Sequence, residues 1–235
     1  MQQYSCSLIN GYPIANIRGR NFLVDTGLPF TVADRPMLIE GKRFEVAPEV
    51  MGITARQMSS SIGFPVDGIL GANVTDEFVL TIKPLQHKLG FDQYLDAFPV
   101  KMEIENLGGT AIMKQTIAGK RIKAFLNLGT RLSYISPAMI EGLEPIGLQS
   151  DVLGMVGEIE TEVYELPISI GRDTHSFHFG VIPTSIQHMA DMANVQASIG
   201  CELLQHYALA LSMDEGMLML DPLRPKFVSL PALPK

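Results

Sequence analysis

Two short stretches of this chain place a small polar residue at the end of an apolar run, just before a glycine turn. The first is FLVDTGLPF at 22–30, which carries Asp25, and the second is FLNLGTRLS at 125–133, which carries Asn127. A carboxyl group held in this way can take or give a proton, whereas the amide of Asn127 can only hydrogen-bond. The question is whether these are two copies of one motif, of which only the first has a carboxylic acid.

Both stretches belong to a longer internal repeat. After a variable stretch, each is followed by a short segment that ends in glycine, ILG at 69–71 and SIG at 198–200, and then by two apolar strands. The second copy carries an insertion in its middle, because its landmarks lie further apart. An ordered repeat of this length predicts two lobes of similar structure. We assign residues 1–105 to the first lobe and 106–235 to the second, with the joint near the glycine pair at 108–109.

The elements that must position these residues are mostly strands. Short β-branched and aliphatic segments recur along the chain with Gly, Pro or Asn between them, so the predicted fold class is all-β. Helical periodicity is confined to residues 137–142 and 185–195. Three strands lie outside the repeats, YSCSLI at 4–9, VKMEIE at 100–105 and KFVSL at 226–230. We expect these three to pair in a common sheet beneath the lobes.

Composition and charge exclude several classes of function. Of the 235 residues, 46% are hydrophobic and 18% are charged, which is typical of a folded globular protein. The formal net charge of −7 disfavours binding to nucleic acid or to anionic membranes. No apolar run is long enough to span a membrane, and the start of the sequence lacks the features of a signal peptide. These observations predict a cytoplasmic protein.

The sequence shows no pattern for a metal or a cofactor, and we expect neither. Cys6 and Cys201 are isolated, and His175 and His178 of THSFHFG fall on opposite faces of a strand, as solvated or packed side chains. The glycine pairs lack the spacing of a nucleotide-binding loop. The serines at 59–61 have no His or Asp context for nucleophilic catalysis, and a loop is predicted there.

The ordered pair of motifs resembles the aspartic peptidase superfamily, which includes the pepsins and the retropepsins. The resemblance rests on VDTG at 24–27 with ILG at 69–71, and on LNLGT at 126–130 with SIG at 198–200, and it spans residues 11–225. It implies two pseudo-symmetric β lobes with a peptide-binding cleft between them. In such a site two close carboxylates share one proton, so that one activates water while the other donates to the peptide carbonyl oxygen.

For the first motif the resemblance implies a complete set of site residues. Asp25 is the expected catalytic carboxylate, Thr26 locks the two loops together, and Gly27 lets the backbone turn tightly beside the reacting centre. The alternative is that Asp25 is a turn residue at the end of a strand, since Asp and Gly are common in turns.

The second motif departs from the family pattern. Asn127 stands at the second catalytic position and Leu128 replaces the Thr or Ser, while Gly129 and Thr130 remain as the expected contacts to a bound peptide. Asn can hydrogen-bond across the site but has no proton to transfer. A purely structural role for Asn127 stays open. The candidate flap of the first lobe, EVAPEVMGITARQMSSS at 45–61, has no counterpart of the family's flap tyrosine.

Three functions remain open at this point. The first is a relative of the aspartic peptidases that binds extended peptides or proteins in its cleft with impaired proteolysis. The second is an active aspartic endopeptidase, either through pairing of Asp25 residues from two chains or because Asn127 stands where a native chain has Asp. The third is a structural or interaction scaffold that keeps only the fold. A monomer and a homodimer are both compatible with the sequence.

Overall fold

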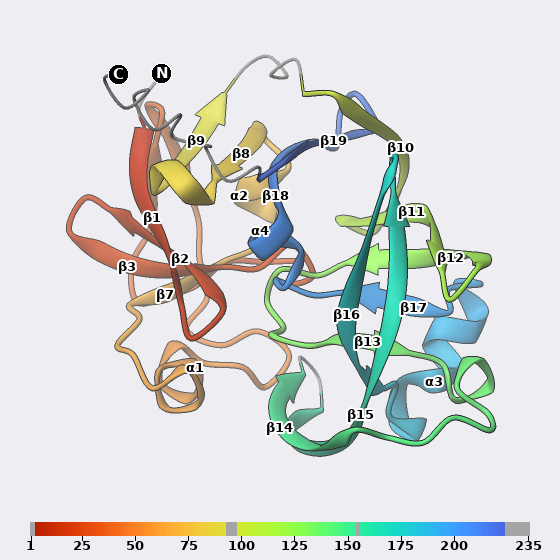
Figure 1. Cartoon of the computed structure of the whole chain (residues 1–235). Helices are drawn as coiled ribbons and strands as arrows, with labels where there is room; N and C mark the ends of the chain where they lie inside the picture. Colours follow the sequence, from red (N-terminus) through yellow and green to blue (C-terminus); the bar gives the residue numbers. More distant parts are fainter. Residues whose placement is uncertain (1–2, 93–97, 154–155, 224–235) are drawn as a thin grey trace, which may run out of the picture.

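The computed structural model describes residues 3–92, 98–153 and 156–223, and strands dominate it (Figure 1). The predicted all-β class is therefore confirmed. The strands of the first lobe are β1 (Gln3–Ile9), β2 (Tyr12–Ile17), β3 (Arg20–Val24), β4 (Val32–Ala33), β5 (Met37–Ile39), β6 (Lys42–Phe44), β7 (Gly68–Leu70), β8 (Val79–Lys83) and β9 (Lys88–Asp92). The joint strand and those of the second lobe are β10 (Val100–Leu107), β11 (Thr110–Ile117), β12 (Lys120–Leu126), β13 (Ser133–Ile135), β14 (Gly147–Leu153), β15 (Gly157–Ile170), β16 (Asp173–Val181), β17 (Ala197–Ile199), β18 (Tyr207–Ser212) and β19 (Met217–Pro222). Where exactly one lobe gives way to the other stays a prediction.

The helices are short, and they test three local predictions. The helix predicted at 185–195 is confirmed as α3 (Thr184–Met192), and the one predicted at 137–142 is a 3₁₀ turn, Pro137–Met139. The remaining helical elements are α1 (Ala55–Ile62), the 3₁₀ turn Pro84–Gln86, α2 (Ala72–Thr75) and α4 (Leu203–His206). None of the helices in the described ranges is long and apolar enough to cross a membrane.

The loop predicted at 59–61 is wrong, because these serines lie in α1. The reason is a capping box at the start of this helix. The Thr54 hydroxyl accepts the N–H of Gln57, and the Gln57 side chain accepts the N–H of Thr54. Gly63 then ends the helix in the left-handed conformation at φ 69°.

Each lobe repeats the arrangement that the sequence predicts around its polar residue. In the first lobe β3 runs parallel to β7, and in the second lobe β12 runs parallel to β17. The backbone N–H of Asp25 donates to the carbonyl oxygen of Leu70 at 3.0 Å, and that of Asn127 donates to Ile199 at 2.9 Å. The two polar residues therefore end equivalent strands beside equivalent glycine segments.

A continuous sheet joins the two lobes, but its central strands are not the predicted ones. Its strands follow the order β1–β9–β8–β18–β19–β10, so the central pair, β8 with β18, comes from different lobes. The predicted segments YSCSLI and VKMEIE form β1 and β10, which do not pair with each other; β1 also pairs with β2, and β10 with β11. The third predicted segment, KFVSL at 226–230, lies outside the described residues. All six side chains of β18 are buried, because this strand lies in the middle of the sheet.

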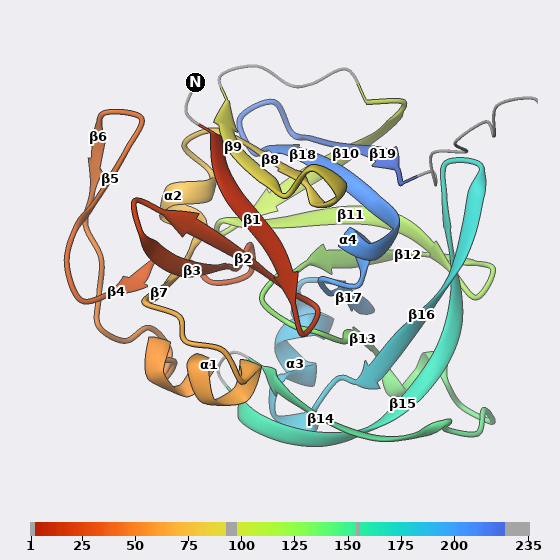
Figure 2. The same cartoon turned by 60° about the vertical axis from the view of Figure 1, so that its left-hand side comes forward.

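The insertion in the second lobe forms a long antiparallel arrangement. Strand β15 pairs with β14 on one side and with β16 on the other, and its start curves toward the first lobe, where α1 lies (Figure 2). In the corresponding stretch of sequence, the first lobe has the short strand β4, the hairpin β5–β6 and the helix α1. The lobes thus share the strand pairs β3–β7 and β12–β17 that hold Asp25 and Asn127. They differ in the segments that connect these strands.

Candidate active site

The two loops that carry Asp25 and Asn127 meet at the base of one cleft between the lobes. Both side chains line this cleft. A Cβ atom on Gly27 would lie 2.7 Å from the Asn127 side chain, and one on Gly129 would overlap the Asp25 carboxyl group. Each polar side chain therefore rests against the glycine of the opposite loop, and only glycine leaves room for it.

The two glycine segments beneath the loops make equivalent hydrogen bonds. The N–H of Gly71 donates to the Thr31 hydroxyl at 3.0 Å, and the N–H of Gly200 donates to the Ser133 hydroxyl at 3.1 Å. A Cβ on Gly71 would lie 2.6 Å from the backbone carbon of Phe30, and a Cβ on Gly200 would overlap backbone atoms as well. The loops are thus held from below by equivalent close contacts.

The predicted lock between the loops is present on one side. The Thr26 hydroxyl, 2% exposed with its residue, donates to the carbonyl oxygen of Leu126 at 2.9 Å and accepts the N–H of Leu128 at 3.1 Å. Leu128 has no hydroxyl group, so it cannot make the equivalent hydrogen bonds to the backbone of the first loop. Its fully buried side chain packs in the main core instead. Thr130 borders the cleft, but its hydroxyl donates to the backbone oxygens of Asn127 and Leu132.

Asp25 is held in a setting that favours its protonated form. One carboxylate oxygen, Oδ1, accepts the N–H of Gly27 at 2.8 Å and the N–H of Leu28 at 3.1 Å. Burial raises the pKa of Asp25 to about 6, against the opposing effect of these two N–H donors. On the other loop, Asn127 Oδ1 accepts the N–H of Gly129 at 3.0 Å. The raised pKa therefore comes from desolvation and not from a second carboxylate.

This raised pKa predicts that Asp25→Asn stabilises the protein at neutral pH. An amide oxygen can accept both N–H bonds that Oδ1 accepts now, so the replacement keeps them. Because the pKa of Asp25 is above its usual value of 3.8 in the folded state, ionisation costs stability between about pH 4 and 6, and the whole cost is present above that range. We expect the variant to gain about 2 to 3 kcal/mol at pH 7.5 and nothing near pH 4.

Urea unfolding of the wild type and the variant at both pH values measures this difference. The exposed Asp221 supplies a control, since Asp221→Asn is expected to leave the free energy of unfolding unchanged at either pH. A stability difference between wild type and Asp25→Asn that is the same at pH 4 and pH 7.5 would contradict the argument.

The cleft above the loops has a volume of about 400 Å³ and is lined mainly by apolar side chains from both lobes. Three of them are exposed although they are large and apolar: Met51 at 46%, Leu107 at 50% and Met189 at 47%. They come from three separate elements. Further lining residues are Pro29, Ile53, Met58, Phe125, Val152, Leu153, Ile182 and Ile186.

Only part of this lining was predicted from the sequence. The candidate flap at 45–61 lines the cleft through Met51, Ile53 and Met58. It makes a parallel bridge from Ala47 to Val32 and a tight antiparallel turn between Val50 and Ile53, and α1 follows. The hairpin that reaches the cleft is β14–β15 of the second lobe. Its length and alternation are visible in the sequence, but its direction depends on tertiary contacts.

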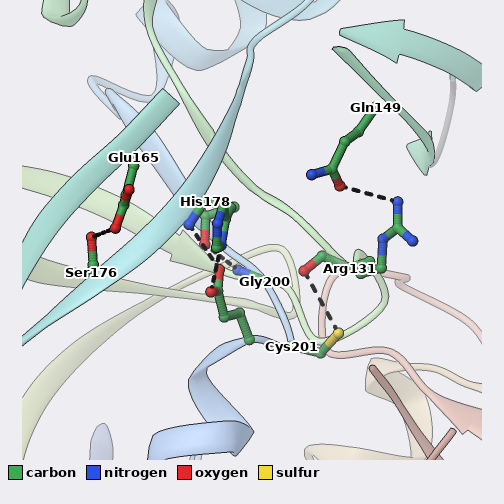
Figure 3. Close-up of polar contacts among 9 residues, drawn as sticks. Arg131, Gln149, Glu165, Ser176, His178, Gly200 and Cys201 are labelled. Carbon is green, nitrogen blue, oxygen red and sulfur yellow. Dashed lines mark hydrogen bonds and ion pairs between the residues drawn. The ribbon is translucent and has the colours of Figure 1, made fainter. Parts of the chain in front are cut away.

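The two histidines of THSFHFG bond locally. His178 Nδ1 lies 2.8 Å from Glu202 Oε1, a contact drawn in Figure 3, and His175 Nε2 lies 3.0 Å from the Tyr207 hydroxyl. Within the described part of the chain, no group of three or more His, Cys, Asp or Glu is placed to hold a metal ion.

Comparisons with known proteins agree with this architecture. No protein-family model matches the chain, and no curated protein matches it significantly in sequence. Among solved structures, it is similar to an aspartic proteinase from Irpex lacteus, with a TM-score of 0.56, 11% identity, and 97% of this chain and 98% of that chain covered. It also matches a retropepsin-like aspartic protease from Rickettsia conorii, with a TM-score of 0.38, 15% identity, and 54% and 95% covered. The likeness to the Irpex lacteus structure over nearly the whole chain shows that this chain has the two-lobed all-β fold of the aspartic proteinases.

Proposed function

We propose that this protein binds extended, apolar peptide segments in the cleft between its lobes and hydrolyses them poorly or not at all. The observation that carries this proposal is the cleft itself. Met51, Leu107 and Met189 leave apolar surface exposed around one hollow of about 400 Å³. Soluble proteins rarely gather such surface without a binding role. Asp25 and Asn127 at the base supply polar groups for a peptide backbone.

The impaired hydrolysis follows from the chemistry of the two loops. Peptide hydrolysis in this fold needs one group that takes a proton from water and another that gives one to the carbonyl oxygen. Asp25 fills one role in either protonation state but not both at once. Asn127 has no titratable proton, and its neighbour Leu128 lacks the hydroxyl that would complete the lock.

The other two functions have less support. Pairing of Asp25 residues from two chains requires another loop where Asn127 now lies, against Gly27. A pure scaffold does not account for a desolvated carboxyl group with a pKa of about 6 at the base of an apolar cleft. We also place the protein in the cytoplasm, because both cysteines are free and buried, which suits a reducing compartment.

A binding experiment with matched leucine variants tests the cleft. We expect wild type to bind members of a fluorescein-labelled octapeptide library whose four central positions vary among Leu, Ile, Val, Met and Phe. Leu107→Asp puts a charge on the apolar lining, so affinity for those peptides is expected to fall roughly tenfold or more. The control is Leu85→Asp, because Leu85 is 65% exposed and lies away from the cleft lining. Fluorescence anisotropy measures both.

The proposal fails if wild type binds no member of the library, or if the two aspartate variants lose affinity equally. Thermal unfolding of both variants checks that they are folded at the assay temperature. Efficient cleavage of the library by the wild-type monomer would support the endopeptidase alternative instead.

A further inference from the structure

The end of strand β14 carries a buried carboxylate that the site chemistry does not use. Asp151 is 5% exposed, and both of its oxygens accept two hydrogen bonds each. Oδ1 accepts the hydroxyl of Tyr12 at 2.8 Å and the N–H of Val152 at 2.9 Å. Oδ2 accepts the N–H of Leu132 at 3.0 Å and the hydroxyl of Tyr134 at 3.0 Å. A charged group in such a position is satisfied only by this complete set of donors.

These donors come from three parts of the molecule. Tyr12 belongs to β2 of the first lobe, and it is 4% exposed. Leu132 and Tyr134 follow the loop of Asn127 in the second lobe. Because Asp151 binds to all of them, one carboxylate connects β14, the Asn127 loop and the opposite lobe.

Arg131 attaches the same strand to the same loop. Its guanidinium group donates to the carbonyl oxygen of Ser150 at 2.8 Å and to Gln149 Oε1 at 3.3 Å, and Figure 3 shows it turned toward Gln149. Below it, the Cys201 thiol lies 3.9 Å from the carbonyl oxygen of Arg131. The last three residues before Val152 are thus all held by hydrogen bonds.

Two hollows border this strand end. Val152 and Leu153 line the cleft on one side, and on the other side Asp151 and Val152 border a second hollow of about 670 Å³. Tyr12 and Arg131 line that second hollow as well. Val152 and Leu153 are nevertheless buried, at 8% and 6% exposed, and each belongs to a hydrophobic cluster, Val152 to that of Tyr12 and Leu153 to that of Leu132 and Tyr134. The residues that donate to Asp151 are thus members of the same clusters, and the polar contacts of Asp151 fix how Val152 and Leu153 pack among them.

We propose that Asp151 is a positioning residue that holds Val152 and Leu153 over the cleft, so that the second lobe covers a bound peptide. This inference rests on the proposed peptide binding. In the first lobe, residues 45–61 reach the cleft through the short turn between Val50 and Ile53 and through α1, whereas the longer hairpin β14–β15 comes from the second lobe. Burial and the neighbouring Asp151 carboxylate raise the pKa of Tyr12 and of Tyr134, so both hydroxyls stay donors.

The first test removes the hydrogen bond that crosses between the lobes. In Tyr12→Phe we expect amide exchange in residues 147–153 and 156–163 to become roughly tenfold faster, with the rest of the chain unchanged. For the tightest-binding labelled octapeptide of the library, the dissociation rate is expected to rise by a similar factor while the association rate stays the same. Hydrogen-exchange mass spectrometry and stopped-flow anisotropy measure these changes.

Asp151→Asn is the second variant, and it is expected to act in the same direction more strongly. Each carboxylate oxygen accepts one backbone N–H, from Val152 or from Leu132. In either orientation, the amide of Asn turns its own NH₂ group against one of these donors. The control is Ser61→Ala, which removes another hydroxyl bond between the lobes, the exposed contact to Glu158 at 3.1 Å. It is expected to change neither measurement.

Each outcome decides the inference. Unchanged hairpin exchange in both Tyr12→Phe and Asp151→Asn overturns it, as does a rise in exchange spread evenly over the whole chain. Local exchange that rises while the octapeptide dissociates at the wild-type rate also overturns it. If wild type binds no octapeptide, the proposed function fails, and hairpin exchange alone decides whether Asp151 positions the strand end.

Discussion

Replacing Asn127 by Asp, together with Leu128 by Thr, is expected to raise the rate of peptide cleavage at acid pH by about 10²- to 10⁴-fold. The Asn127 side chain already lies against Gly27 in the opposite loop, so a carboxylate there faces the cleft beside Asp25. Two such groups share one proton, which splits their pKa values and supplies an acid and a base together. The hydroxyl of a threonine at position 128 would make hydrogen bonds to the backbone of the first loop, equivalent to those that Thr26 makes to the second loop.

Cleavage of a quenched fluorescent octapeptide between pH 3 and 7 measures this gain. In the double variant, Asp25→Ala is expected to remove it completely, since one carboxylate is again left. Leu128→Thr alone serves as the control for the loss of apolar packing at this fully buried position. The account is wrong if Asn127→Asp brings no gain with or without the threonine. Wild-type cleavage that grows with protein concentration and follows dimer formation would point to pairing of Asp25 between chains.

Gly200→Ala is expected to lower the free energy of unfolding by about 1 to 3 kcal/mol or more. The added Cβ would overlap the carbonyl oxygen of Leu132, a backbone atom that cannot move without displacing the Asn127 loop. Gly71→Ala is expected to act in the same way, because its Cβ would lie 2.6 Å from the backbone of Phe30. Urea unfolding measures both changes.

Gly147→Ala is the matched control, since nothing lies within 4 Å of its Cβ and its φ is not in the left-handed region. We expect this variant to stay within about 0.5 kcal/mol of wild type. Equal stabilities for Gly147→Ala and Gly200→Ala would show that the glycine segments are not closely packed against the loops.

The framework of the site could be predicted from the sequence because it is repeated there. Asp25 and Asn127 end apolar strands, Gly71 and Gly200 follow at comparable places, and their hydrogen bonds are equivalent. The start of α1 also has a signal in the sequence, since Thr54 and Gln57 have the spacing of a capping box, and this signal argues against the loop predicted at 59–61.

The cover of the cleft could not be predicted in this way. Tyr12 and Asp151 are 139 positions apart, and no motif around either residue predicts that the two are in contact. The burial of Leu128 could not be predicted either. It depends on the core residues that pack behind the loop, and these are distant in the sequence. Contacts of this kind are set by tertiary packing, which local patterns do not contain.

The central strand pair of the shared sheet has a consequence for how the chain is made. Strand β8 pairs with β18, and Ile82 finds its partner Leu209 more than a hundred residues later. At a synthesis rate of about 5 to 20 residues per second, the edge of β8 waits on the order of ten seconds for that partner. Four of its five residues are buried in the finished protein. The nascent first lobe therefore presents an unpaired apolar strand edge during this interval, and an edge of this kind can pair with other chains.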